Sequence, residues 1–128
     1  MVLKSHLDED PTVTDPELYT VAFENDRVRV LEYRDTPGAT THPHRHPDSV
    51  MVTLSSFQRR VTAFEHGTVG GRSAEIELTA GQVRWVGAQE HVGENTGTTD
   101  THVFFIELKE PSFGTPVGEA PPLGPSAG

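Results

Sequence analysis

The stretch GATTHPHRHPDS, residues 38–49, holds three of the seven histidines in this 128-residue sequence. Side chains two residues apart on a β-strand leave the same face, so His44 and His46 can direct their imidazoles at one metal ion. A proline stands on each side of this pair and disturbs regular strand structure. The stretch therefore predicts a short strand over residues 44–46 that carries two metal ligands.

A second stretch with a histidine is GQVRWVGAQEHVGEN, residues 81–95. A strand is expected to begin after Gly81, and a turn follows at Gly87. His91 then opens the next strand, and Asn95 lies four residues further on, on the same face. This stretch therefore offers a third imidazole from a separate strand.

The remaining sequence between residues 18 and 109 consists of short segments typical of β-strands. VRVLEYR, residues 28–34, alternates with period two, which is the pattern of a half-buried strand. The similar segments are LYTVAF (18–23), SVMVTLS (49–55), QRRVTAF (58–64), AEIELT (74–79), QVRWVG (82–87) and THVFFIELK (101–109). No segment has a long 3.6-residue period, so little helix is expected. Many short strands with frequent turns predict an all-β sandwich or barrel.

The two histidine stretches, in this order and within an all-β pattern, resemble the two motifs of the cupin superfamily. The first motif, G-x5-H-x-H, matches from Gly38 to His46. The second motif ends in H-x3-N and matches Gly81, His91 and Asn95. It departs from the family pattern in two ways: a glycine replaces its proline, and the span from glycine to histidine is one residue shorter.

The resemblance covers roughly residues 18–109 and implies an RmlC-like jelly-roll β-barrel. It also implies that the metal ligands are His44, His46 and His91. The chain then divides into a flexible N-terminal arm (1–17), the cupin barrel (18–110) and a C-terminal tail (111–128) in which nine residues are proline or glycine. The tail is expected to be ordered only if Phe113 or Leu123 docks on the barrel or on a second subunit.

One departure from the first motif bears on chemistry. The glutamate of the motif should fall near residues 49–51, which here are serine, valine and methionine. The sequence therefore resembles the three-histidine branch of the cupins, in which three neutral ligands leave the +2 charge of the metal uncompensated. Such a site favours a small chelating anion and leaves coordination positions open. Imidazoles suit Fe(II) and Zn(II) alike, so both remain candidates for the divalent cofactor.

Two neighbouring residues could alter this ligand set. His42 is either an exposed loop residue, an acid–base group beside the metal ligands, or an alternative ligand. Asp48 could restore a carboxylate ligand, although its place after Pro47 favours an exposed turn.

His42 and Arg60 are the candidate catalytic residues. Alternation along residues 58–64 places Arg60 on one face of its strand and Arg59 on the other. If the face of Arg60 points inward, its guanidinium can pair with an anionic substrate. If that face points outward, Arg60 is a solvated surface residue.

Three functions remain open from the sequence. The resemblance to small β-diketone-cleaving cupins favours a three-histidine Fe(II) dioxygenase-like enzyme acting on a small anionic or chelating metabolite. Zinc in the same site would instead support a lyase, isomerase or condensation step, as in the cupin part of hydrazine-forming synthetases. The third reading is a small-molecule binding module without catalysis.

Composition narrows the remaining classes. The formal net charge of −9 disfavours nucleic-acid binding. Cysteine is absent, which excludes thiolate metal sites and is compatible with the cytoplasm. No secretion signal or membrane-spanning run is evident, so we expect a cytoplasmic protein with no membrane partner. The resemblance further implies a homodimer.

Overall fold

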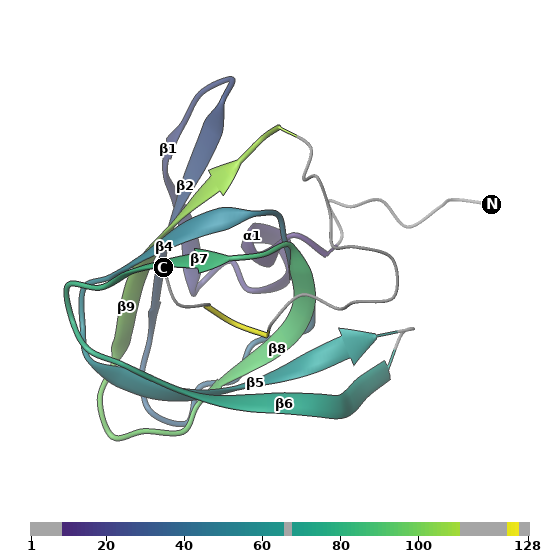
Figure 1. Ribbon diagram of the computed structural model, residues 1–128, viewed down its shortest axis with the longest axis vertical. Coiled ribbons are helices and arrows are strands. Elements are labelled where there is room, and N and C mark those ends of the chain that lie inside the picture. The colour runs from purple at the N-terminus through teal and green to yellow at the C-terminus, as the bar shows by residue number, and fades with distance from the viewer. Residues whose placement is uncertain (1–8, 66–67, 111–122, 126–128) are drawn as a thin grey trace.

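The computed structural model describes residues 9–65, 68–110 and 123–125. Its elements are α1 (Pro11–Thr14), β1 (Tyr19–Glu24), β2 (Val28–Asp35), β3 (His44–His46), β4 (Ser49–Thr53), β5 (Phe57–Glu65), β6 (Thr68–Leu78), β7 (Val83–Val86), β8 (Gln89–Asn95) and β9 (Thr101–Leu108). Strands dominate and α1 is a single short turn of helix, so the all-β prediction is confirmed (Figure 1).

The strands form two antiparallel sheets that face each other. One has the order β1-β2-β9-β4-β7 and the other the order β3-β8-β5-β6. Each of the β-segments expected from the sequence lies on one of these strands. Within the described residues the two sheets are separate hydrogen-bonded units, so the architecture is a two-sheet jelly roll and not a fully closed barrel.

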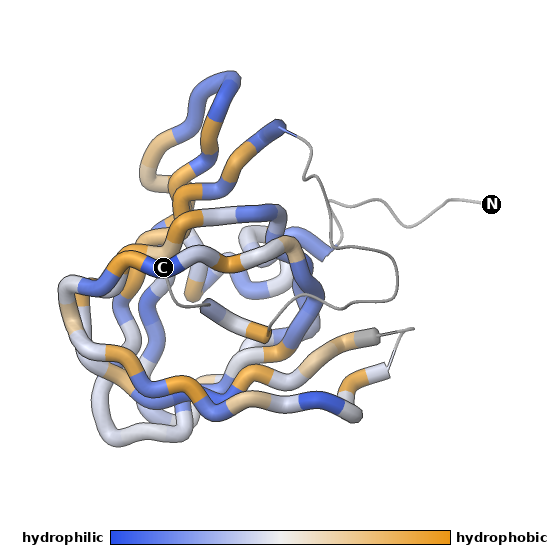
Figure 2. The backbone as a smooth tube through the Cα atoms, viewed as in Figure 1, coloured by the Kyte–Doolittle hydropathy of each residue, from blue (hydrophilic) through white to orange (hydrophobic). Residues whose placement is uncertain are grey.

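The core lies between the sheets and follows the period-two pattern. Along β2, Leu31 and Tyr33 are buried, and along β9, Val103 and Phe105 are buried. Figure 2 shows the resulting alternation of hydrophobic and hydrophilic residues along the strands. Burial of this inner face is the main source of stability for a two-layer β fold.

Pairing between β3 and β8 joins the two histidine stretches. His44 lies directly opposite His91 in this antiparallel pair, and His46 lies opposite Gln89. Directly opposed residues on neighbouring strands project from the same face of a sheet. The register therefore brings the third predicted ligand to the first two.

The part of the N-terminal arm that the structure describes is not loosely held. Asp10 caps α1 by accepting a hydrogen bond from the Thr12 backbone, and its carboxylate also pairs with Arg29. Asp15 follows the helix, is buried, and accepts a hydrogen bond from the His42 backbone at 3.1 Å. Two carboxylates therefore hold the described part of the arm, residues 9–17, to β2 and to the loop before β3; residues 1–8 lie outside the described part.

Of the expected tail, the structure describes Leu123–Pro125, which dock on the barrel beside β8 (Figure 1). Phe113 lies outside the described residues. Among the helices that the structure describes, none is long and apolar enough to cross a membrane.

Candidate metal centre

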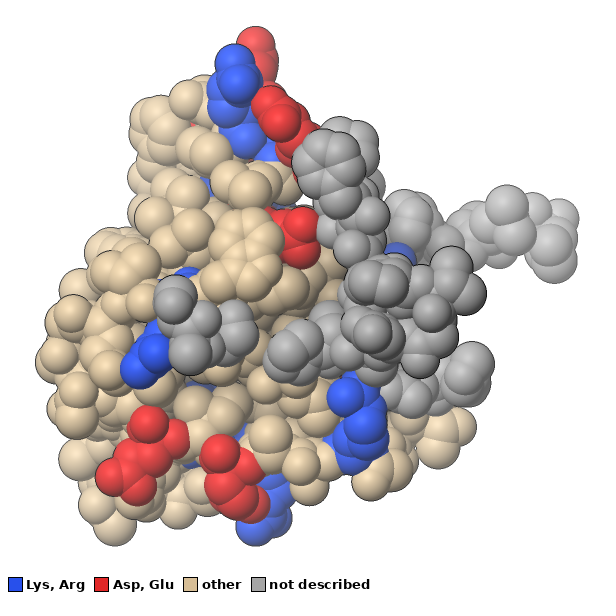
Figure 3. Space-filling model, viewed as in Figure 1, with Lys and Arg blue, Asp and Glu red and all other residues tan. Residues whose placement is uncertain are grey.

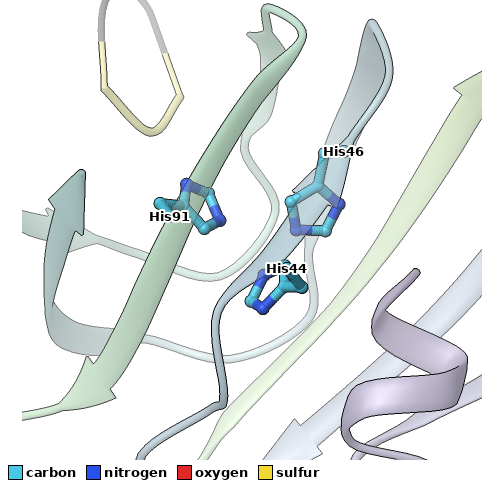
Figure 4. Close-up of side chains that lie close together, drawn as sticks. All are labelled: His44, His46 and His91. Carbon is cyan, nitrogen blue, oxygen red and sulfur yellow. The ribbon is translucent and has the colours of Figure 1, made fainter. Parts of the chain in front are cut away.

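Three buried imidazoles meet between the sheets. His44 and His46 project from β3 and His91 from β8, and their rings turn toward one another (Figure 4). The ring centroids are 4.7 to 5.0 Å apart, and one ring nitrogen from each lies within 4.8 Å of the others. The predicted ligand residues therefore converge on one point and could hold a metal ion.

Hydrogen bonds fix which nitrogen faces that point for two of the three rings. Nδ1 of His44 lies 2.8 Å from the His42 carbonyl oxygen, which can only accept, so Nδ1 carries the proton. Nδ1 of His91 lies 2.8 Å from Oε1 of Gln89, whose amide is oriented by a bond from Nε2 to the Gly87 carbonyl. In both rings Nε2 is therefore the unprotonated nitrogen, as metal ligation requires.

His46 provides the most direct sign that a ligand belongs here. Both of its ring nitrogens are buried without a hydrogen-bond partner. Leaving buried polar atoms unpaired is costly, and such atoms in a native fold usually bind water, an ion or a ligand. A metal ion bound by the three imidazoles would satisfy one of them, so these residues fit a divalent metal.

A carboxylate that the sequence did not single out lies behind His46. Glu107 on β9 is buried, and its Oε2 is 3.7 Å from Nδ1 of His46. Its other oxygen accepts a 2.7 Å hydrogen bond from Arg29, which also pairs with Asp10 at 2.7 Å. An outer carboxylate of this kind orients a ligating imidazole and raises its basicity. Glu107 escaped prediction because it is distant in sequence and looks like one more charge on a strand.

The electrostatics keep two of the imidazoles neutral. Burial, helped by the neighbouring charge of His46, lowers the pKa of His44 to about 3. Burial likewise holds the pKa of His91 well below its usual range, with His44 and His46 adding to the effect. Both rings are therefore unprotonated at neutral pH, which is the form that binds metals.

A pocket opens beside the imidazoles. It has a volume of about 500 Å³, including the space at its mouth, and His44 and His91 form part of its lining. Tyr19 also lines it, and the phenol oxygen lies 3.4 Å from Nε2 of His44. Burial keeps the pKa of Tyr19 well above its usual range, so this hydroxyl remains a proton donor. The sequence did not indicate this role for Tyr19, because a tyrosine at the start of a strand is usually a core residue.

The arginine that faces the pocket is Arg59 and not Arg60. Arg59 is buried, and its Nη1 donates to Asp35 at 2.6 Å. Arg60 points to the outer surface, where it pairs with Glu75 at 2.6 Å. The inward placement of Arg60 is therefore wrong: the strand alternates as expected, but the face carrying Arg59 is the inner one.

His42 and Asp48 both lie outside the cluster. The His42 side chain is 73% exposed and its Nδ1 lies 2.9 Å from Asp15, whose hydrogen bond raises the pKa of His42. Of the three alternatives for His42, this position agrees with the exposed loop residue and not with an acid–base group or a ligand, and the contribution of His42 to the site is the backbone carbonyl that holds His44. Asp48 accepts a hydrogen bond from the Ala88 backbone at 2.8 Å and so fixes the turn before β8.

Known structures share this architecture. A cupin domain from Bordetella pertussis Tohama I is 30% identical, over 73% of this chain and 93% of that one, with a TM-score of 0.63. A cupin superfamily protein from Desulfitobacterium hafniense is 18% identical over 73% and 77% of the two chains, with a TM-score of 0.52. An RmlC-like cupin with a double-stranded β-helix fold from Methanocaldococcus jannaschii is 9% identical over 71% and 78%, with a TM-score of 0.54. No protein-family model and no curated protein gives a significant match to the sequence.

Fold and site together define a small two-sheet β protein with a buried three-histidine cluster at the edge of a pocket. The identity to the Bordetella domain, across nearly all of its length, extends the likeness from architecture to sequence. This chain belongs to the cupin superfamily.

Proposed function

We propose that this protein is a cytoplasmic, metal-dependent enzyme that acts on a small anionic or chelating metabolite by a dioxygenase-like reaction. The observation that carries the proposal is the set of three buried imidazoles at the pocket, one of which has no hydrogen-bond partner. When bound, a divalent metal such as Fe(II) supplies a Lewis acid and a template for substrate and dioxygen. The lack of cysteine supports the cytoplasmic assignment.

The residues around the imidazoles have separable tasks. The His42 carbonyl and the Gln89 amide hold two rings with Nε2 facing the centre. The Tyr19 hydroxyl, beside Nε2 of His44, can donate a hydrogen bond to an oxygen atom of a substrate bound there. The apolar walls of the pocket exclude water, which strengthens these polar contacts.

The test begins with the metal content of the protein as isolated, followed by anaerobic loading with Fe(II). Oxygen uptake is then measured with a panel of 1,3-dicarbonyl compounds and thiols. Cleavage of a 1,3-diketone consumes one O₂ and breaks one C–C bond, and both oxygen atoms end in the two products. Loss of the enolate absorbance should therefore match oxygen uptake one to one.

Two variants make this test specific. His91→Ala should lose most of the bound metal, because it removes one of three ligands. His102→Ala is the matched control, since His102 pairs with Glu32 away from the cluster. Full metal retention in His91→Ala would contradict the site. Bound zinc with oxygen-independent turnover would support the non-oxidative alternative, and ligand binding without turnover would support a binding module.

A further inference from the structure

Apart from the imidazoles, the walls of the pocket are mainly apolar. They include Met51 and Phe105 from one sheet and Val61 and Ile76 from the other. A charged group placed against such walls would lose its hydration without gaining a partner. The part of a substrate that does not reach the imidazoles should therefore be apolar.

Arg59 is the one cation that lines the pocket among the described residues, and its charge is already matched. Its Nη1 donates to Asp35 at 2.6 Å and to Thr101 at 3.1 Å, and its Nη2 donates to the Tyr33 hydroxyl at 3.1 Å. Tyr33 in turn donates to Asp35. Because the Arg59–Asp35 pair is neutral, it offers no net charge for a second anionic group.

The charges behind His46 set the charge that the site can accept. Asp10, Arg29 and Glu107 form a row with charges −1, +1 and −1, which leaves −1 in total. The three imidazoles add none when neutral. A divalent metal would leave the site at +1, which one negative charge on the substrate would neutralise. A doubly charged anion would leave an uncompensated buried charge.

The remaining wall comes from the C-terminal segment Leu123–Pro125. The backbone N–H of buried Gly124 donates to Oε1 of Gln89 at 2.8 Å, and Gly124 and Pro125 line the pocket. Gly124 has φ +67°, and a Cβ on it would overlap Cδ1 of Ile76. Its close approach to β6 limits the size of group that the pocket can enclose.

From these observations we propose that the pocket takes a singly charged bidentate anion whose remaining part is a compact apolar group packed against Leu123–Pro125. The inference rests on the proposed metal site and names its substrate class. It excludes dicarboxylates and other compounds that carry a second charge, and it makes the C-terminal segment a determinant of substrate size.

The first experiment measures the binding of chelating anions to the full chain loaded with Co(II). Binding is detected as a change in the visible spectrum of the metal, without turnover. Acetylacetone, which chelates a metal as a singly charged enolate with methyl groups, should bind at least about tenfold more tightly than malonate, a dianion of similar size. Equal or tighter binding of malonate would overturn the proposed substrate class. Protein that holds no metal would contradict the proposed function itself, so the two failures are distinguishable.

The second experiment tests the wall. Dibenzoylmethane has the same chelating group as acetylacetone but two phenyl substituents, and it should not perturb the spectrum of the unaltered protein. Gly124→Val should displace the segment and admit this ligand. Gly71→Val is the matched control, since Gly71 also has a positive φ but no heavy atom near its Cβ position. Exclusion of dibenzoylmethane by Gly124→Val, or its admission by Gly71→Val, would overturn the role of the segment.

Discussion

Two of the candidate ligands, His44 and His91, are held in their metal-binding form mainly by burial. His44 and His91 have lowered pKa values because a charged imidazole between the sheets would lose its hydration. In the unfolded chain both rings have ordinary pKa values near 6.5. The folded protein therefore binds fewer protons than the unfolded chain below about pH 6.5, and acid favours unfolding.

This proton difference predicts a pH dependence for the metal-free protein. Its free energy of unfolding should fall as the pH drops from about 6.5 toward 4, with a slope of up to about 1.4 kcal/mol per pH unit for each buried histidine. His44→Gln should flatten the decline by removing one of the two groups. The measurement is the urea midpoint of metal-free protein at several pH values.

The control for this prediction is His42→Ala. The pKa of His42 is raised by Asp15, so its stabilising contact is present at low pH and is lost as the pH rises. Removing it should leave the acid-side decline in place. A flat profile in the unaltered protein would mean that the buried rings are not held neutral by the fold.

At the scale of the element, β5 shows how one strand separates two arginines. Phe57, Arg59 and Val61 face the core, while Gln58 and Arg60 are exposed. Arg59 is enclosed by Asp35, Thr101 and the Tyr33 hydroxyl, so its removal would leave the buried Asp35 carboxylate without a counter-charge. Arg60 has a solvent-exposed partner, and exposed ion pairs contribute little.

Substitution of the two arginines should therefore have unequal effects. Arg59→Ala is expected to lower the free energy of unfolding by about 3–5 kcal/mol, because Asp35 is left buried without a counter-charge. Arg60→Ala should change it by less than about 0.5 kcal/mol. Thermal or urea unfolding of both variants measures the difference. Similar losses in the two would show that β5 presents the other face to the core.

The same strand shows where sequence reasoning stops. Period two is visible in QRRVTAF, but adjacent arginines give no sign of which face is inner, because that depends on the strands packed opposite. The spacing of His44 and His46 has no such ambiguity. Two residues that lie two apart on one strand share a face, whichever face of the strand is the inner one. Joining them to His91 needed the family motif, because the register between β3 and β8 is not written in either segment alone.

Residues that support the ligands were beyond prediction for a related reason. Glu107 and Asp35 are ordinary charges on alternating strands, and each gains its role from a partner far away in sequence. The C-terminal segment was expected to dock only through an apolar side chain. It docks at Gly124 by a backbone hydrogen bond and by the absence of a side chain, which composition does not reveal.

For the whole molecule, the two outer sheet faces differ in character. On the five-stranded sheet, the pairing register aligns one apolar row across all strands: Phe23, Val30, Ile106, Val50 and Trp85. None of these side chains is fully buried, and Phe23 is 54% exposed. The outer face of the other sheet carries ion pairs such as Arg60 with Glu75 and Arg45 with Glu90. Figure 3 shows charged side chains near the β1–β2 hairpin and over the lower strands, and the tan surface between them is interrupted by smaller acidic and basic groups.

From this asymmetry we propose that the expected homodimer forms through the apolar row. Two chains of charge −9 repel each other except where both surfaces are uncharged, and the apolar row is such a surface. We expect the unaltered protein to be a dimer by light scattering and Ile106→Glu to be a monomer, because two buried carboxylates would face each other across the interface.

Val92→Glu places the same charge on a half-buried position of the other sheet and should remain dimeric. Dimers that tolerate Ile106→Glu would place the interface elsewhere, and a monomeric unaltered protein at high concentration would mean that this apolar row stays in water.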